Sequence, residues 1–196
     1  MKKAKSCLLL IILVFVLSGC ATPNIDKGYS ISEASDYGVI IASLTKTGFG
    51  HWPPGYNFER IDSSKKGVLK FNQNMFDRIV SDFPETDGKL IVLELPAGEY
   101  QINRWFISQG YIGLESVEGF EIRFTVVPGK ATYIGELNND RSAGGILGTG
   151  LARIRFDVKD SWDRDINKVK NEYPNLSSIR IEKILMNIVS LGRKQH

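Results

Sequence analysis

Cysteine and histidine are both scarce in this sequence, which contains only two of each among its 196 residues. The cysteines are Cys7 and Cys20, and the histidines are His51 and His196. A zinc site needs three or four converging His, Cys or carboxylate side chains, and His51 has no such neighbour along the chain. The sequence therefore predicts no metal site, and no motif in it indicates a cofactor.

The residues for nucleophilic catalysis are also in short supply. No Gly-x-Ser-x-Gly motif occurs, and a Ser-His-Asp arrangement would have to use His51 as its base. His51 lies in a stretch whose glycines and prolines do not indicate rigid support for a catalytic group. We therefore predict that the protein is not an enzyme, and a hydrolase that depends on His51 is the least favoured alternative.

An excess of positive charge is absent once the N-terminus is set aside. The chain has 25 Lys and Arg against 22 Asp and Glu, and three of the lysines are Lys2, Lys3 and Lys5. The remainder carries 22 basic and 22 acidic residues. A neutral domain lacks the basic patch that nucleic-acid binding requires, so we expect no nucleic-acid partner.

A short apolar run follows the three N-terminal lysines. It extends from Cys7 to Leu17 and contains no charged residue. A helix that spans a bilayer needs roughly 20 apolar residues, so this run is too short to remain in the membrane. A basic segment before a short apolar segment is typical of a secretory signal, which we predict over residues 1–19.

The end of this signal is Leu17-Ser18-Gly19-Cys20, which resembles the lipobox of bacterial lipoproteins. The resemblance implies that the Cys20 thiol carries a diacylglycerol, that the chain is cut before Cys20, and that the new amino group is acylated, for example with palmitate. Two or more buried acyl chains hold a protein stably on a membrane. Because Ala21 rather than Asp follows, resemblance to proteobacterial lipoproteins implies the outer membrane, with the protein facing the periplasm.

The rest of the chain divides into a spacer, one domain and a tail. Residues 20–36 contain the lipidated cysteine and a small, polar stretch, which we interpret as a flexible tether. The folded domain is expected over residues 37–192, and residues 193–196 are expected to fray. With Cys7 removed and Cys20 acylated, no disulfide could form within one mature chain.

Alternation of apolar and polar residues dominates the domain and predicts β-strands. In Phe120-Glu121-Ile122-Arg123-Phe124-Thr125-Val126 the apolar residues fall on one face, and residues 131–137 return after a Pro128-Gly129 turn. Residues 89–95 and 100–108 suggest a second hairpin, and the apolar run 90–93 suggests a central strand. Further strands are expected over residues 39–46, 56–61, 67–71 and 152–158. The fold class is therefore mainly β, an antiparallel β-sandwich of about seven to eight strands.

One amphipathic helix interrupts this pattern near the C-terminus. Its apolar stripe is Trp162, Ile166, Val169 and Tyr173, which predicts a helix from residue 161 to about residue 173. Asp160 or Ser161 could cap its start, and Pro174 marks its end. Residues 178–190 fit either a strand or a helix, and we favour a strand that completes the sheet.

Four acidic residues surround the start of this helix: Asp157, Asp160, Asp163 and Asp165. Their spacing lacks the glycine and the terminal glutamate of an EF-hand calcium loop. We therefore interpret them as a solvated helix start, where acidic side chains interact favourably with the helix dipole.

A second resemblance concerns the fold. The stretch Leu93-Glu94-Leu95-Pro96-Ala97-Gly98-Glu99-Tyr100-Gln101-Ile102 is similar to a hairpin of transthyretin-like and carboxypeptidase-regulatory-like β-sandwich domains. The resemblance implies that Gly98 permits a tight turn and that Tyr100 packs in the core of the next strand. The stretch from Phe124 to Gly135, which ends in Tyr133-Ile134-Gly135, is similar to a later strand pair of those domains. The resemblance implies a non-catalytic envelope module and transfers no catalytic residue.

The most promising binding segment in the sequence is an aromatic loop. Phe49, His51, Trp52 and Tyr56 lie around Pro53-Pro54, which could present a rigid apolar surface. The interpretation that we favour for Trp52 and Tyr56 is that they fold back to cover an end of the sandwich. The favoured function is a non-catalytic, lipid-anchored interaction or structural module, whose partner could be an envelope protein or a cell-wall component. The alternative is a binder of a small glycan or peptidoglycan-type ligand through this loop.

Overall fold

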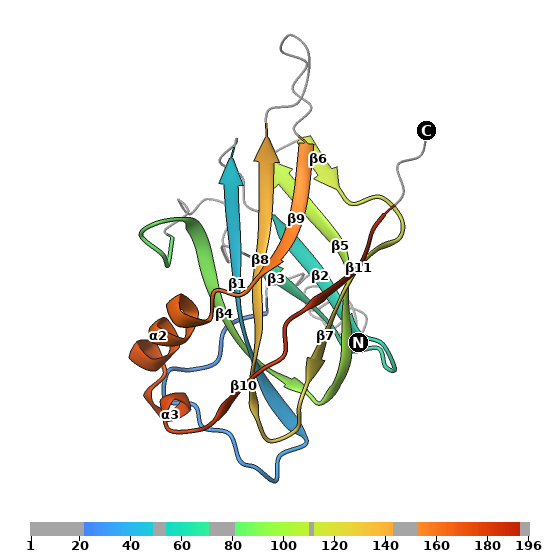
Figure 1. The fold of residues 1–196 in the computed structure, drawn as a ribbon. Helices are drawn as coiled ribbons and strands as arrows, with labels where there is room; N and C mark the ends of the chain where they lie inside the picture. The colour runs from blue at the N-terminus through green and yellow to red at the C-terminus, as the bar shows by residue number, and fades with distance from the viewer. Residues whose placement is uncertain (1–21, 49–53, 71–80, 110–111, 143–152, 193–196) are drawn as a thin grey trace, which may run out of the picture.

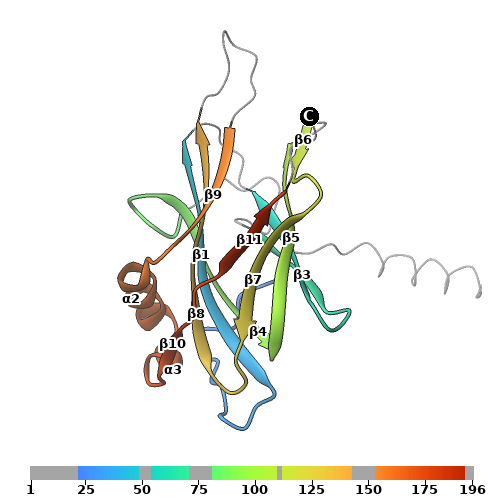
Figure 2. The same ribbon diagram turned by 45° about the vertical axis from the view of Figure 1, so that its right-hand side comes forward.

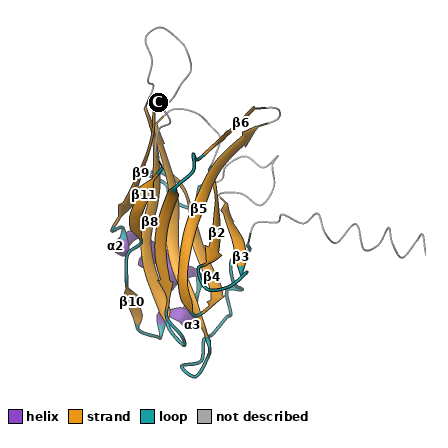
Figure 3. Ribbon diagram, turned by 90° about the vertical axis from the view of Figure 1, so that its right-hand side faces the viewer, coloured by secondary structure: helices purple, strands orange, loops and turns teal. Residues whose placement is uncertain are grey.

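The computed structural model describes residues 22–48, 54–70, 81–109, 112–142 and 153–192. In this part of the chain two β-sheets pack face to face, and two short helices lie against the outer face of one sheet (Figures 1 and 2). Strands make up most of the described residues (Figure 3). The prediction of a mainly β sandwich is confirmed, although the described chain has eleven strands rather than seven or eight.

The first sheet has five strands, in the order β10-β8-β1-β4, with β9 also paired to β8. Their bounds are β1 Tyr37–Gly48, β4 Asp87–Pro96, β8 Ala131–Ser142, β9 Arg153–Lys159 and β10 Ile181–Lys183. Strands β1 and β8 run parallel, as do β10 and β8, so this sheet is not wholly antiparallel as we expected. The register of β1 with β8 shifts between Ile41 and Ala42. Gly135 lies at this irregularity with a φ of 96°, a backbone conformation that other residues rarely adopt.

The second sheet has six strands, in the order β11-β7-β5-β2-β3, with β6 also paired to β5. Their bounds are β2 Gly55–Arg60, β3 Lys66–Lys70, β5 Gly98–Gln109, β6 Ile112–Glu115, β7 Phe120–Val126 and β11 Asn187–Leu191. The chain reaches β11 directly from β10, so the C-terminal strands connect the two sheets. The preference for strands over residues 178–190 agrees with these two short elements.

The core consists of two apolar layers. Between the sheets, alternate residues of each strand interdigitate, and Phe58, Tyr100 and Phe124 form an aromatic group with ring centroids 5.2 to 6.2 Å apart. On the outer face of the first sheet, residues of β1, β4 and β8 pack under the helices. Strand β1 is therefore buried on both faces.

Neither of the two expected hairpins forms. At each of these turns the chain instead passes from one sheet to the other, as a corner of the sandwich. Strand β4 pairs with β1 and belongs to the first sheet, whereas β5 pairs with β2, β6 and β7 in the second. Strands β7 and β8 are divided in the same way. The turns at Pro96-Ala97-Gly98-Glu99 and Pro128-Gly129 lie where we expected, but turn chemistry alone does not decide which strand becomes the partner.

Strand β4 lies at an edge of the first sheet, not at its centre as its apolar run suggested. Its residues are buried on both faces because the second sheet covers one face and the helix region covers the other. Polar side chains also bind the edge of β4 that faces away from β1. Asp82 Oδ2 accepts a hydrogen bond from the Leu90 N–H, and Asn24 Oδ1 accepts one from the Val92 N–H.

The helix prediction is confirmed, with helix α2 at Trp162–Glu172 and its apolar stripe facing the first sheet. Asp160 Oδ1 accepts a hydrogen bond from the Trp162 N–H at 3.2 Å, whereas the Ser161 side chain does not cap the helix. Pro174 ends α2 as expected but also begins a second short helix, α3 Pro174–Ser177.

The segment expected to be a free tether packs along the domain. Over residues 22–36, the Thr22 N–H donates to the Val68 carbonyl on β3, and the Ile25 N–H donates to the Val92 carbonyl on β4. Ile25, Tyr29 and Ile31 pack against the outer apolar layer. Residues 22–25 therefore join the edge strands of the two sheets, and this stretch is part of the folded body.

Candidate functional site

Most of the residues that the sequence suggested for binding lie outside the described residues: Cys20, Phe49, His51 and Trp52. Tyr56 is described, and it is a core residue of β2 with no exposed surface. Its ring packs edge-on against Phe156, with ring centroids 6.3 Å apart. The hypothesis that Tyr56 presents an aromatic contact surface is therefore wrong, because its ring faces the interior of the sandwich.

The Tyr56 hydroxyl lies near buried polar groups of β8. Asn139 is fully buried and Arg141 is 4% exposed, and the Arg141 Nε–H donates to Asn139 Oδ1 at 2.6 Å. Among the described residues, the Tyr56 hydroxyl, Asn139 Nδ2 and Arg141 Nη2 have no hydrogen-bond partner. Burial raises the pKa of Tyr56 and lowers the pKa of Arg141, since both charged forms are poorly solvated there.

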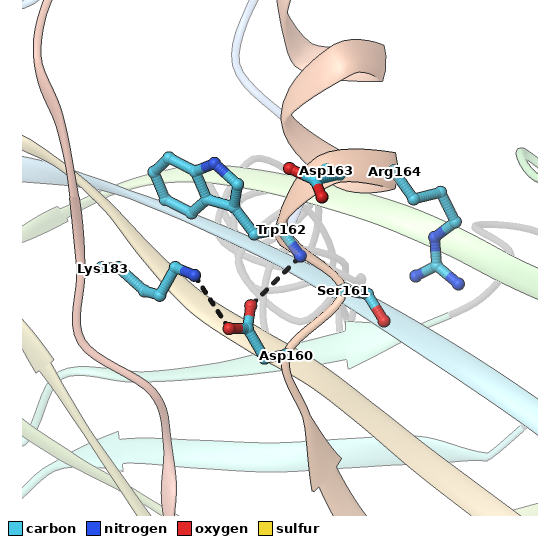
Figure 4. A pocket seen from close by; sticks show the side chains of 6 residues that line it. All are labelled: Asp160, Ser161, Trp162, Asp163, Arg164 and Lys183. Carbon is cyan, nitrogen blue, oxygen red and sulfur yellow. Dashed lines mark hydrogen bonds and ion pairs between the residues drawn. The ribbon is translucent and has the colours of Figure 1, made fainter.

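A recess of about 240 Å³ opens on the surface where the chain passes from β9 into α2 (Figure 4). Its walls come from the start of the helix and from β10: Asp160, Ser161, Trp162, Asp163, Arg164 and Lys183. The recess forms here because β10 pairs with the first three residues of β8, and this pairing brings Lys183 next to the start of the helix.

The outer groups of the recess interact with one another. Lys183 Nζ lies 2.8 Å from Asp160 Oδ2 and 4.9 Å from the centre of the Trp162 ring. The hydrogen bond from Lys183 lowers the pKa of Asp160, whose carboxyl group is exposed. The Trp162 ring is half-buried and packs edge-on against Tyr133, with ring centroids 5.3 Å apart.

Beneath the recess lies a buried polar network centred on Glu136 of β8. Its carboxylate accepts hydrogen bonds from the Ser161 hydroxyl at 2.6 Å and the Thr45 hydroxyl at 2.5 Å, and Arg164 Nη2 lies 2.9 Å away. Burial by itself would raise the pKa of Glu136. The hydrogen bonds from Ser161 and Thr45 and the charge of Arg164 outweigh burial and lower this pKa.

The second carboxylate of the network is Asp165 of α2, which is fully buried. Its Oδ2 accepts hydrogen bonds from the Ser43 hydroxyl at 2.6 Å and the Tyr133 hydroxyl at 3.0 Å, and Arg164 Nη2 lies 2.7 Å from Oδ1. Burial raises the pKa of Asp165 despite these contacts. The interpretation of Asp165 as part of a solvated helix start is therefore wrong.

Sequence reasoning missed this network, although a signal for it was present. In β1 the outward-facing residues change from Val39 and Ile41 to Ser43 and Thr45, and the outer face of the strand becomes polar midway. Such a change indicates a polar partner above that part of the sheet. Only the docked helix identifies the partner as Asp165 and Arg164.

The network holds the start of helix α2 against strands β1 and β8. Ser161 donates to Glu136, and no histidine lies among the described residues. In the same part of the chain, no three His, Cys, Asp or Glu side chains are grouped as metal ligands would be. One arginine bridges two carboxylates, which links the helix to strands β1 and β8.

No protein-family model matches the sequence. No curated protein matches it either. A solved structure with partial similarity is a leucine-rich repeat protein from Bacteroides thetaiotaomicron, at 20% sequence identity and a TM-score of 0.32. The similarity covers 54% of this chain and 14% of that protein, and it carries no argument about this molecule.

Two helices, α2 and α3, lie within the described residues. Neither α2 nor α3 is long and apolar enough to cross a membrane.

Proposed function

We propose that this protein is a non-catalytic lipoprotein of the bacterial envelope, anchored by acyl chains on Cys20. The observation that carries the proposal is Leu17-Ser18-Gly19-Cys20 directly after a short apolar run. Ala21 after the cysteine favours the outer membrane, with the domain facing the periplasm. Its role is that of an interaction or structural module, with an envelope protein or a cell-wall component as its partner.

The geometry of the described residues supports a binding or structural role more than a chemical one. The charged groups at the recess and beneath it interact with one another, as in the pair of Asp160 with Lys183 and the bridge from Glu136 through Arg164 to Asp165. A general acid or base must lie within hydrogen-bond reach of the proton that it transfers to or from a substrate. These groups instead stabilise the docked helix.

The proposed relation to transthyretin-like domains also draws support from the turn between β4 and β5. Gly98 adopts a φ of 145°, which favours glycine, and the Tyr100 ring is buried while its hydroxyl donates to the Pro96 carbonyl at 2.8 Å. These are the roles that the resemblance implies for the two residues.

The anchor is tested by mass spectrometry of the protein purified from bacterial membranes. Wild type should lack residues 1–19 and carry diacylglycerol and an acyl chain at Cys20, and Cys20→Ala should carry neither. The matched control is Cys7→Ala, which changes the other cysteine and should leave acylation intact. An unmodified Cys20, with the leader uncut or cut elsewhere, would contradict the proposal.

The interaction role is tested separately, by cross-linking in intact cells that express wild type or Cys20→Ala. We expect wild type to give a reproducible cross-linked envelope partner or a cell-wall adduct that the Cys20→Ala form loses. A protein that gives no such product, and whose deletion changes neither envelope permeability nor shape, would contradict this part of the proposal.

A further inference from the structure

The N-terminal segment leaves very little free chain between the proposed anchor and the folded body. Thr22 is already fixed to β3, because its N–H donates to the Val68 carbonyl at 3.0 Å and its hydroxyl accepts from the Val68 N–H at 3.2 Å. A side chain at Gly67 would come within 2.7 Å of the Thr22 hydroxyl oxygen, so the contact is close. In the sequence, only Ala21 separates Thr22 from Cys20.

The length of this connection can be compared with the thickness of a lipid headgroup layer. An extended chain spans at most about 3.6 Å per residue, so the Cα atom of Cys20 lies within roughly 7 Å of that of Thr22. A bilayer of about 40–45 Å with a hydrocarbon core of about 30 Å has headgroup layers of roughly 5–8 Å on each side. The connection is no longer than one such layer.

We propose that the acylated protein stands directly on the bilayer that holds its acyl chains, with the β2–β3 edge in contact with phospholipid headgroups. By the β2–β3 edge we mean β3 and the turn of residues 61–66. This inference rests on the proposed acylation of Cys20. It replaces the expectation of a domain held away from the membrane by a flexible tether.

The chemistry of the turn fits a headgroup surface. All six residues from 61 to 66 are exposed, and Ile61 is 47% exposed despite its apolar side chain. Two ion pairs lie at the turn, Arg60 with Asp62 at 2.6 Å and Lys66 with Glu59 at 3.3 Å. Lys65 has no ion-pair partner among the described residues, so its ammonium is free to meet a lipid phosphate.

The opposite side of the molecule points away from this contact. Helix α2 and the turn of residues 61–66 lie on opposite sides of the sandwich in Figures 1 and 2. The face that carries α2 and the recess at Asp160 therefore stays accessible from the aqueous compartment. A macromolecular partner would meet this face rather than β3.

Depth-dependent fluorescence quenching tests the orientation. One dye can be attached at an introduced cysteine, because Cys20 is the only cysteine of the mature chain and is blocked by lipid in the acylated protein. Ser64→Cys places a thiol on the exposed turn, and Asn167→Cys places the matched control on the exposed side of α2. Each acylated protein is labelled with the same dye and reconstituted in vesicles of phosphatidylethanolamine and phosphatidylglycerol that contain a headgroup nitroxide lipid. We expect the dye at position 64 to be quenched several-fold more than the dye at position 167.

An insertion tests whether the short connection between Cys20 and Thr22 is what brings the domain into contact with the lipid headgroups. About twelve Gly and Ser residues between Ala21 and Thr22 would span roughly 20 Å as a flexible coil. This insertion should abolish most of the difference between the two dyes while leaving acylation unchanged. Retention of the full difference would show that the short connection does not hold the domain down and would overturn the proposal.

Mass spectrometry of the same samples separates the two ways to fail. Acylated protein with equal quenching at positions 64 and 167 overturns the proposed orientation and leaves the anchor standing. Protein without an acyl group at Cys20 overturns both.

Lys65→Glu should reduce quenching at position 64, whereas Lys170→Glu on α2 should not, and equal effects would overturn the assigned lysine contact.

Discussion

Glu136 and Asp165 share one arginine but have pKa values that shift in opposite directions. Burial affects both carboxyl groups, yet Glu136 gains enough from Ser161 and Thr45 hydroxyls and from Arg164 to keep its pKa below the ordinary value. For Asp165, burial is the larger effect and its pKa is raised. The two carboxyl groups should therefore affect the pH dependence of stability in opposite ways.

We predict that Glu136→Gln and Asp165→Asn alter this pH dependence with opposite signs. The contribution of Glu136 is present above its unfolded pKa, near 4.5, and is lost as pH falls through its lower folded pKa. Glu136→Gln should therefore lower the free energy of unfolding by about 1–3 kcal/mol at neutral pH, and by less in acid. The measurement is urea unfolding of the chain from Thr22 onward between pH 3 and pH 8.

For Asp165 the sign is reversed. A folded pKa above the ordinary 3.8 contributes stability that is present below pH 3.8 and is lost as pH rises through the folded value. The deficit of Asp165→Asn relative to wild type should therefore be largest in acid and shrink as pH rises. Parallel pH profiles for the two variants would contradict the assigned directions.

At the scale of elements, the edges of the sheets are closed by short polar segments rather than by further strands. Residues 22–25 pass from β3 to β4, and Asn24 Nδ2 donates to the Leu90 carbonyl while its Oδ1 accepts from the Val92 N–H. An uncovered edge strand invites pairing with another chain. The Asn24 side chain occupies edge groups of β4 that a second molecule could otherwise bind.

We predict that Asn24→Ala destabilises the domain by about 1–2 kcal/mol, because two hydrogen bonds to β4 are lost. The variant should also self-associate more readily than wild type, since the edge of β4 is then exposed. Urea unfolding and sedimentation velocity over a range of concentrations measure the two effects. Asn167→Ala, on the exposed side of α2, is the control, and an equal loss of stability there would contradict the edge role.

At the scale of the whole molecule, the fold depends on contacts between distant parts of the chain. The central parallel pair joins β1 to β8, whose paired residues are about 90 positions apart in the sequence, as in Val39 and Ala131. The two corners send successive strands to opposite sheets, so neighbours in sequence are not neighbours in a sheet. Chains of this kind must close long loops before their strands pair.

We predict slow refolding for this reason, in the range of about milliseconds to seconds that is typical of β-sandwiches. Stopped-flow fluorescence can follow Trp105, which is 9% exposed, as it enters the core. The chain from Thr22 onward has no cysteine, so the refolding rate should not change with a reducing agent. Folding faster than a millisecond would contradict the dependence on distant pairing.

Local patterns predicted the elements well because their causes are local. Alternation located β1, β2, β3, β7 and β9 within one or two residues and located the start of β8, although β8 extends five residues beyond its expected end. The apolar stripe located α2. The turn residues at Gly98 and Gly129 adopt the positive φ angles that their sequence suggested. Pairing was predicted poorly, because a strand with an apolar face packs equally well beside several possible neighbours.

The candidate site was predicted less well than the elements. The residues chosen for exposed binding were aromatic, yet Tyr56 is buried, and the polar network at Glu136 was missed. A serine or threonine in a strand indicates a polar environment without naming its source. The source here is a helix more than 100 residues further along the chain, as in the bond from Ser43 to Asp165.

The amino-acid sequence by itself determined the strand-rich class, the position of the helix and the expectation of an anchor at Cys20, because periodicity, capping and motif spacing act over a few residues. The tertiary structure alone decided which strands pair, that β4 is an edge, and that residues 22–25 bind to β3 and β4. These outcomes depend on how apolar faces and unpaired backbone groups are shared among segments far apart in the chain, and no local pattern encodes that choice.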